Sequence, residues 1–312
     1  MVDMVKVLVA KKEAVYATDA APTVGANAII TRNFSSKAVE VDRLNRNLDS
    51  GSFGATPDAP SNERQTLAYE VEMAGSGAAG TAPAWMELLE ACGMAAPAET
   101  EDTDAVQRFA AASATKSSLT QHHWIGDQRR KAVGCRGNFS INWSANAYPF
   151  IQFNFIGMIP EATPFDVNVP GAADISRWIE PFEVNKANSL LALDGFACIT
   201  RSLQIDANID LTMRSLIGAR YVHLGNHRAT GRLSVEAPSI ATKDYLNTLR
   251  KGDRVALTAT NGTVAGNIVE LGCAKTQILD ITDREENGKL MWDMDLLLTI
   301  EAGQDDLIIT AK

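Results

Sequence analysis

Residues 67–94 limit the fold most, because their hydrophobic period changes from that of a strand to that of a helix within a few residues. The first part alternates acidic and apolar side chains, at Glu70, Val71, Glu72 and Met73. This predicts a strand with one dry face and one wet face. After a glycine-rich turn, apolar side chains recur at helical spacing, at Trp85, Leu88, Leu89 and Cys92. We expect this helix to begin with Thr81 as its N-cap and to end at Gly93.

The turn between strand and helix reads GxGxxG, at Gly75, Gly77 and Gly80, which is the spacing of a dinucleotide-binding loop. Three features argue against nucleotide binding. The preceding strand alternates, whereas the first strand of a doubly wound sheet is apolar on both faces. The glycines precede the expected helix start, so the helix dipole would not point at a bound pyrophosphate, and no acidic residue ends a second parallel strand. We therefore interpret the glycines as a flexible strand-to-helix turn.

Length and composition allow about two domains, because 312 residues of which 46% are hydrophobic can build a core in each. The formal net charge of -9 argues against a sequence-independent grip on nucleic-acid phosphates, which needs clustered Lys and Arg. The cysteines are scattered without a CxxC pair, which predicts neither a disulfide framework nor a zinc site. No signal peptide and no long apolar run is present in the sequence, so we expect a soluble protein folded in a cytoplasm.

The chain divides into an expected N-terminal arm, residues 1–28, and two β domains, residues 29–170 and 171–312. The second domain faintly repeats the first at a displacement of 164 residues, which relates Val39 to Leu203 and Val71 to Val235. Both copies are expected to follow the order strand, long loop, strand, helix, hairpin and strand pair. Chance agreement of a few spacings is the alternative, because alternating strands are common in any β protein. In the second copy, 261–262 (Asn-Gly) is the expected two-residue hairpin turn.

The candidate chemical motifs all have a simpler structural interpretation. His223 and His227 are spaced like metal ligands on a helix, but a Gly-Asn pair lies between them and no third ligand is placed, so we expect hairpin histidines in solvent. Residues 122–123 alternate, so one histidine is expected to be buried and the other exposed. The segment starting at Asp283 resembles a calcium loop, but Met294 stands where a bidentate Glu is required. We therefore expect no cofactor and no metal.

Three segments together resemble the major tail tube proteins of long-tailed bacteriophages. They are residues 11–30, 67–94 and 131–163. The turn GSGAAGTAPAW is the most distinctive of these motifs. Residues 171–312 resemble the family mainly through the internal repeat.

This resemblance implies a structural protein without enzymatic activity. It also implies a mainly β fold with two tandem tail-tube-like β-sandwich or barrel domains, each with a flanking α-helix. In the family, inner sheets join edge to edge into a ring with one continuous inner β-barrel. Rings stack into a hollow tube that conducts DNA and encloses the tape measure protein. Pairing the edges also removes an aggregation hazard, since an unpaired edge is a template for another chain.

The implied partners are further copies of the chain, in rings of three chains with pseudo-sixfold symmetry or of six chains. The others are the tape measure protein, the tail terminator and distal tail or baseplate proteins. DNA is expected to pass without specific binding. The expected location is the virion tail, after assembly in the host cytoplasm and without a membrane.

The lumen of such a ring is expected to be faced by the polar members of the alternating strands. They are Glu40, Asp42, Glu70, Glu72, Gln204, Asp206 and Glu236. Acidic walls repel phosphate, so DNA would not be retained during passage.

Two segments, 43–64 and 209–228, have the pattern of long loops and are expected to contact the next ring. The side chains assigned to this contact are Arg43, Asp49, Phe53, Arg64, Arg214 and Arg220. The alternative for the first segment is a disordered surface loop.

The alternative function is a β-sandwich baseplate or receptor-binding component of a phage tail. Such a module would cluster aromatic side chains for ligand contact, whereas the five tryptophans are dispersed along the chain.

Overall fold

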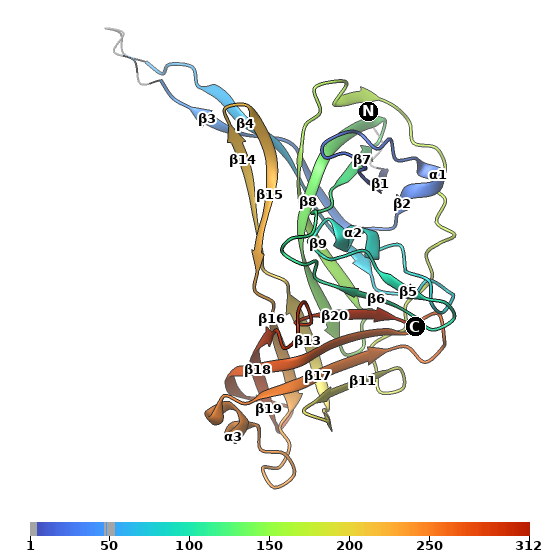
Figure 1. Cartoon of the computed structure of the whole chain (residues 1–312), viewed down its shortest axis with the longest axis vertical. Helices are drawn as coiled ribbons and strands as arrows, with labels where there is room; N and C mark the ends of the chain where they lie inside the picture. Colours follow the sequence, from blue (N-terminus) through green and yellow to red (C-terminus); the bar gives the residue numbers. More distant parts are fainter. Residues whose placement is uncertain (1–4, 47, 49–53) are drawn as a thin grey trace.

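The computed structural model confirms a mainly β chain, with 53% of residues in strands and 5% in helices. The structure describes residues 5–46, 48 and 54–312. The molecule is elongated, with two hairpins extending from one end and α3 (Tyr245–Lys251) at the other (Figure 1).

Eight antiparallel strands form one continuous sheet, called here the central sheet. Its order is β3 (Arg32–Leu44), β4 (Ala59–Glu72), β9 (Phe150–Met158), β8 (Gln128–Ser144), β13 (Thr200–Asp206), β16 (Thr230–Glu236), β19 (Lys289–Thr299) and β18 (Val269–Glu286). The first four strands come from the first predicted domain and the last four from the second. The pairing of β8 with β13 joins the two halves into one sheet. The division of the chain into two domains at residue 170 stays a prediction.

Alternation along the strands decides which face of the central sheet is buried. Tyr69 and Val71 of β4 and Leu203 and Val235 of the second half all lie in the core. Each such side chain contributes about 1.5–3 kcal/mol by leaving water. The intervening polar side chains therefore lie together on the opposite face, called here the polar face.

Two further sheets pack against the buried face. The first contains β2 (Ala28–Ile29), β1 (Lys6–Lys12), β7 (Leu119–Ile125), the start of β8 and β10 (Phe165–Val167). The second contains β12 (Phe196–Ala197), β11 (Ser189–Leu193), β17 (Arg254–Asn261), the start of β18, β20 (Ile308–Ala311), β6 (Asp104–Arg108) and β5 (Ala98–Thr100). Each half is thus a sandwich whose two layers share one long strand.

The shared strand β8 leaves one layer for the other at a bulge. Gly134 has a φ of 59°, and the pairing of β8 with β9 shifts register between Val133 and Arg136. The step at 134–135, which has the pattern of a break between strands, is therefore a bend within one strand.

The N-terminal segment expected as an arm is partly built into the fold. Residues of β1 pair with β7 and β2, and Leu8, Val9 and Ala10 are buried. The short apolar run at the start of the chain is therefore an interior strand, followed by the one-turn helix α1 (Val24–Asn27).

One helix follows the second strand of each half, as expected. α2 (Met86–Glu90) follows β4 and α3 follows β16. The N-cap assignment to Thr81 is wrong, because α2 begins after Trp85, whose buried ring donates from Nε1 to the carbonyl of Ala74 at 2.8 Å. Gly93 does end this turn, with a φ of 84°.

The glycine-rich turn joins the two halves of the molecule. Gly77 N donates to Gly266 O at 2.9 Å, and Gly75 N donates to Asn267 Oδ1 at 2.8 Å. A Cβ on Gly75 would lie 2.0 Å from Gly266 O, and one on Gly80 would lie 2.4 Å from a backbone oxygen. These glycines therefore permit a close approach of two backbones, which explains the GxGxxG spacing without a nucleotide.

Strand pairings refine the internal repeat. Met73 N donates to Pro149 O just after β4, and Ala237 N donates to Leu290 O just after β16, so the displacement of 164 residues holds for these strands. It fails for their hairpin partners. Ala68 of β4 pairs with Ser35, while the corresponding residue of β16 pairs with Gln204, so β3 and β13 are related by 204 − 35 = 169 residues. The predicted match of Val39 to Leu203 is therefore wrong by five residues.

Two predicted turns and loops have different structures. Segment 209–228 is mostly strand and forms a hairpin of β14 (Ile209–Leu216) and β15 (Ala219–His227). Segment 43–64 contains the end of β3 and the start of β4, which pair with each other, and residues 45–58 between them lie outside both strands. Contacts across the strands pair polar residues of these hairpins. In the sequence alone, such runs of polar residues have the pattern of a loop. Asn261 does not form a two-residue turn, because the connection from β17 to β18 runs through 262–268. Its side chain accepts a hydrogen bond from Ser189 Oγ and donates one to Phe182 O.

The histidine predictions are also corrected. His122 and His123 are both buried, because the ring of Phe34 packs against His123 on one face of β7 and Asp19 contacts His122 on the other. His223 and His227 lie within β15 rather than beside a turn. His227 Nε2 lies 2.8 Å from Asp306 Oδ2, and its ring stacks on Phe109 with centroids 3.7 Å apart.

We predict that His123 makes the fold sensitive to acid. Burial, with smaller effects of Arg130 and His122, lowers the pKa of His123 from 6.5 to about 3. As the pH falls below 6.5, His123 of the unfolded chain takes up a proton, whereas His123 of the folded chain stays neutral. The free energy of unfolding therefore falls by about 1.4 kcal/mol per pH unit. Between pH 7 and pH 5, His123→Leu should lose about 2 kcal/mol less stability than the unmodified chain in denaturant titrations. The same change at exposed His223 is the control, and equal slopes for all three proteins would contradict the prediction.

Candidate assembly surfaces

The central sheet ends in two open edges. Among the described residues, β3 pairs only with β4, and β18 beyond Gln277 pairs only with β19. An open edge exposes backbone N–H and C=O groups that pair readily with a strand of another chain. Inside the chain the corresponding edges of the two halves are closed by the β8–β13 pairing, called here the internal seam.

All seven side chains expected to face a lumen lie on the polar face. For five of them the neighbours along the strand point into the core, as with Glu70 beside Val71 and Gln204 beside Leu203. Beside Glu40 the expected dry face is absent, because Val39 is 50% exposed. Glu40 and Asp42 lie in the β3–β4 hairpin, where both contact Arg64. One row of paired residues runs across the sheet from β4 to β18 and includes two of them, Glu72 and Gln204. Its members in order are Glu72, Phe150, Asn142, Gln204, Arg232, Asp295 and Asp280.

The polar face is mixed in charge rather than uniformly acidic. Arg32 Nε lies 2.6 Å from Glu70, Arg64 lies 2.8 Å from Glu40, and Lys289 lies 3.4 Å from Glu236. Hydrogen bonds from Asn62 and Arg64 hold the pKa of Asp42 below its ordinary value. Within the described part of the chain, Glu72, Asp206 and Asp280 have no cation at ion-pair distance, so the repulsion of phosphate would come mainly from such carboxylates.

The β3–β4 and β14–β15 hairpins extend towards the same end of the molecule (Figure 1). Arg220 Nη1 lies 3.7 Å from Glu63 Oε1 and links the two. The β14–β15 tip exposes Leu216 and Ile217, and the first hairpin exposes Leu44 and Leu48. Exposed apolar side chains at the ends of two projecting hairpins indicate a contact surface.

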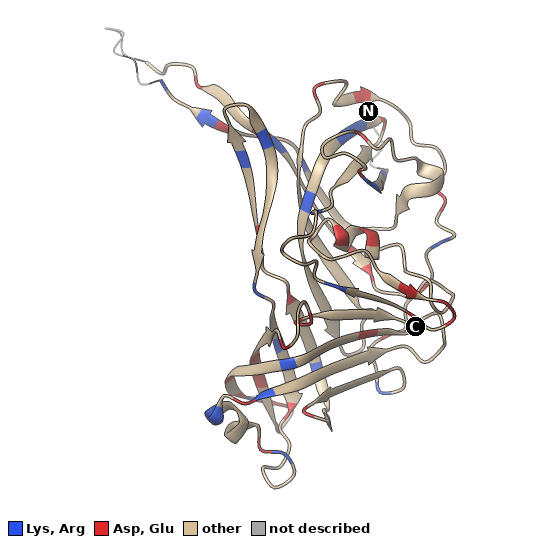
Figure 2. Ribbon diagram, in the orientation of Figure 1, with Lys and Arg blue, Asp and Glu red and all other residues tan. Residues whose placement is uncertain are grey.

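Basic side chains also lie on these hairpins (Figure 2). Of the residues assigned to ring contact, Arg64 turns to the polar face and pairs with Glu40 and Asp42. Arg214 lies over the ring of Tyr221 at 6.0 Å. Arg43 lies in β3 and Arg220 in β15. Asp49 and Phe53 lie outside the described residues.

The β14–β15 hairpin of the second half is anchored on the first half. Val222 N donates to Tyr16 Oη at 2.7 Å, and Arg136 Nη1 donates to Val222 O at 2.7 Å. The Val222 side chain is buried with Val133 and Met158. No motif in the sequence indicated this contact, because its partners are about 60–200 residues apart along the chain.

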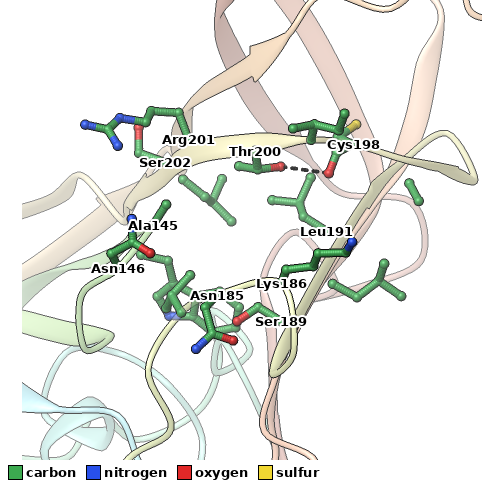
Figure 3. A pocket seen from close by; sticks show the side chains of 16 residues that line it. Ala145, Asn146, Asn185, Lys186, Ser189, Leu191, Cys198, Thr200, Arg201 and Ser202 are labelled. Atoms are coloured by element: carbon green, nitrogen blue, oxygen red, sulfur yellow. Dashed lines mark hydrogen bonds between the residues drawn. The ribbon is translucent and has the colours of Figure 1, made fainter.

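A groove of about 550 Å³ lies at one end of the internal seam (Figure 3). Its lining comes from β11, β12 and β13 and from the end of β8, and is mostly apolar, including Leu191 and Leu203. Thr200 Oγ1 donates to Cys198 O at 3.4 Å within it. Searching the described residues finds no group of three or more His, Cys, Asp or Glu side chains arranged to hold a metal ion.

The comparison with protein families identifies the chain. It matches the phage tail tube protein family over residues 5–309, nearly its whole length. The chain therefore belongs to this family of structural proteins of the phage virion tail. A search of curated proteins gives no significant match. Across the described residues, none of the helices has the length and apolar character needed to cross a membrane.

Proposed function

We propose that this chain polymerises as stacked rings into the hollow tail tube, which conducts DNA and encloses the tape measure protein. The observation that carries the proposal is the central sheet, which is continuous through both halves and open at both edges. Ring closure would pair those edges and form a continuous inner barrel lined by the polar face. The seven polar-face residues named above are the proposed lumen residues.

Within this proposal the ring contains three chains. Each half, taken as one tube domain with boundaries 29–170 and 171–312, supplies four strands to the central sheet, so three chains supply 24 strands. At about 4.8 Å between strands and a tilt of about 40°, 24 strands close at a backbone diameter of about 50 Å. Six chains would double this diameter. Three copies of a two-half chain also give pseudo-sixfold symmetry.

The hairpin tips are the proposed contact between stacked rings. The residues assigned to this contact are Arg43, Asp49, Phe53, Arg64, Arg214 and Arg220. The tape measure protein, the tail terminator and the distal tail or baseplate proteins are the proposed further partners, in the lumen and at the two ends of the tube.

Negative-stain microscopy of the purified full chain tests the function. Tubes of uniform bore are the expected result. A protein that stays monomeric at high concentration would contradict the proposal. Short, closed rings that never stack would instead favour the alternative of a baseplate component.

We predict that Ile217→Asp stops stacking and leaves free rings. Ile217 is fully exposed at the tip of β14–β15, so the charge leaves the fold intact but must be desolvated in a contact between rings. Mass photometry should then show three chains of 33.6 kDa, about 101 kDa. Ile175→Asp, at an exposed position of the linker between the two halves, is the control and should form normal tubes.

A further inference from the structure

We infer that β18 pairs with β3 of a second copy of this chain in the register that β8 and β13 use at the internal seam. The inference rests on the proposed function, because ring closure is what brings the two edges together. It adds which residues meet, and therefore which strand face and which charges lie at each contact between chains.

The two halves have the same strand order, which makes the internal seam a template. β3, β4, β9 and β8 of the first half correspond in order to β13, β16, β19 and β18 of the second. The seam joins β8, the last strand of one half, to β13, the first strand of the other. The open edges are β18 and β3, which are again a last strand and a first strand.

The pairings assign corresponding residues on the first strands. Starting from the match of Met73 to Ala237, Thr66 corresponds to Thr230. Thr66 pairs with Lys37 and Thr230 pairs with Asp206, so Lys37 corresponds to Asp206.

The same steps assign the last strands. Pro149 matches Leu290, so Gln152 corresponds to Asp293. Gln152 pairs with Ser140 and Asp293 pairs with Thr282, so Thr282 corresponds to Ser140. At the internal seam Asp206 lies opposite Ser140. The corresponding contact between chains therefore places Lys37 opposite Thr282 of the second copy.

Side chains in this register are chemically matched. On the polar face, the two diagonal neighbours of Lys37 would be Asp280 and Arg284, each two residues from Thr282. Arg284 is already paired with Glu286 and Asp293, whereas Asp280 is exposed and is the carboxylate available to Lys37. On the buried face, Ser36 would lie opposite Asp283, where the internal seam has Ile205 opposite Ile141. Both members of the apolar pair are thus replaced by polar residues.

Ser36 supports the same register independently. Its Oγ is buried and has no hydrogen-bond partner among the described residues. A buried hydroxyl without a partner is costly, so a native contact is expected to satisfy it. The Asp283 carboxylate of the second copy would accept this hydrogen bond after the Ser36 side chain turns towards the open edge, because atoms of its own chain cover Oγ in the single chain.

Disulfide cross-linking in assembled tubes tests the register. The test variant is Lys37→Cys with Thr282→Cys, built with Cys198→Ser because the other native cysteines are buried. Within one chain these positions lie at opposite edges of eight strands, about 30 Å apart, so a disulfide between them joins two chains. Asp206→Cys with Ser140→Cys, at the internal seam, is the positive control and should cross-link within one chain.

The register control is Lys37→Cys with Glu286→Cys, which moves the second thiol about 13 Å along the same strand face. We expect at least tenfold more covalently linked chains on a non-reducing gel for the Thr282 variant than for this control. Tubes with equal cross-linking in both, or with none at Thr282, would overturn the register and leave the proposed function standing. Cross-linking by Lys37→Cys alone would show β3 paired with β3 and also overturn it. A chain that forms no tubes in any variant would contradict the proposed function itself.

Discussion

Replacing residues 46–57 by two glycines should abolish tube formation while leaving the single chain folded. The removed segment lies in sequence between Leu44, the last residue of β3, and Ala59, the first residue of β4, and its described residues 46, 48, 54, 55 and 57 are exposed. Its ends are already close, because Asn45 Nδ2 donates to Asp58 Oδ1 at 2.8 Å. The free energy of unfolding should therefore change by no more than about 0.5 kcal/mol. Without the contact between rings, rings cannot stack and the tube does not grow.

Microscopy and thermal unfolding together measure this result. The control replaces residues 171–173, an exposed part of the linker between the halves, by glycines of equal number. The control should form tubes like the unmodified chain. Tubes of normal length from the shortened hairpin would remove this hairpin from the proposed stacking contact. A large fall in unfolding temperature would show instead that the hairpin stabilises the single chain.

Gly75→Ala should destabilise the chain by about 3 kcal/mol, because the close approach of two backbones leaves no space for a methyl group. The new Cβ would lie 2.0 Å from Gly266 O and 2.6 Å from Asn267 Cα, and neither backbone atom can move aside as a side chain does. Separation of the two loops would also break the hydrogen bonds from Gly75 N and Gly77 N.

The matched control for this variant is Gly272→Ala. Gly272 lies in β18 with no atom within 4 Å of the position of a new Cβ, so the change should be neutral or slightly stabilising. Denaturant titration at pH 7 measures both variants. A Gly75→Ala chain as stable as the Gly272→Ala chain would show that the two loops separate without cost.

The alternation of polar and apolar side chains was sufficient to predict β4, β9, β13 and the central part of β8, with the correct face buried. Period two is a local property, because each residue's side is decided by its immediate neighbours. For the same reason the polar-face residues were predictable, from Glu70 in the first half to Glu236 in the second. The positions of α2 and α3 after β4 and β16 also followed from local spacing.

Features that depend on residues distant in sequence were not predictable in this way. The hairpin of segment 43–64 resembled a loop, because its polar side chains are explained only by cross-strand partners such as Arg64 with Glu40. The five-residue difference between the repeats of β3 and β13 arises from the longer first hairpin and its bulges. Residues 95–114 have the low complexity of a loop but supply β5 and β6, and β6 pairs with the C-terminal strand β20.

The sequence by itself determined that the chain is mainly β, which strand faces are dry, and that it resembles tail tube proteins. Only the tertiary structure decided that both halves share one sheet and that β3 and β18 are its open edges. The physical reason is that a strand's sidedness is encoded in its own residues, whereas its neighbour is selected by backbone hydrogen bonds that every sequence offers alike. Which edges stay open therefore depends on where the rest of the chain packs.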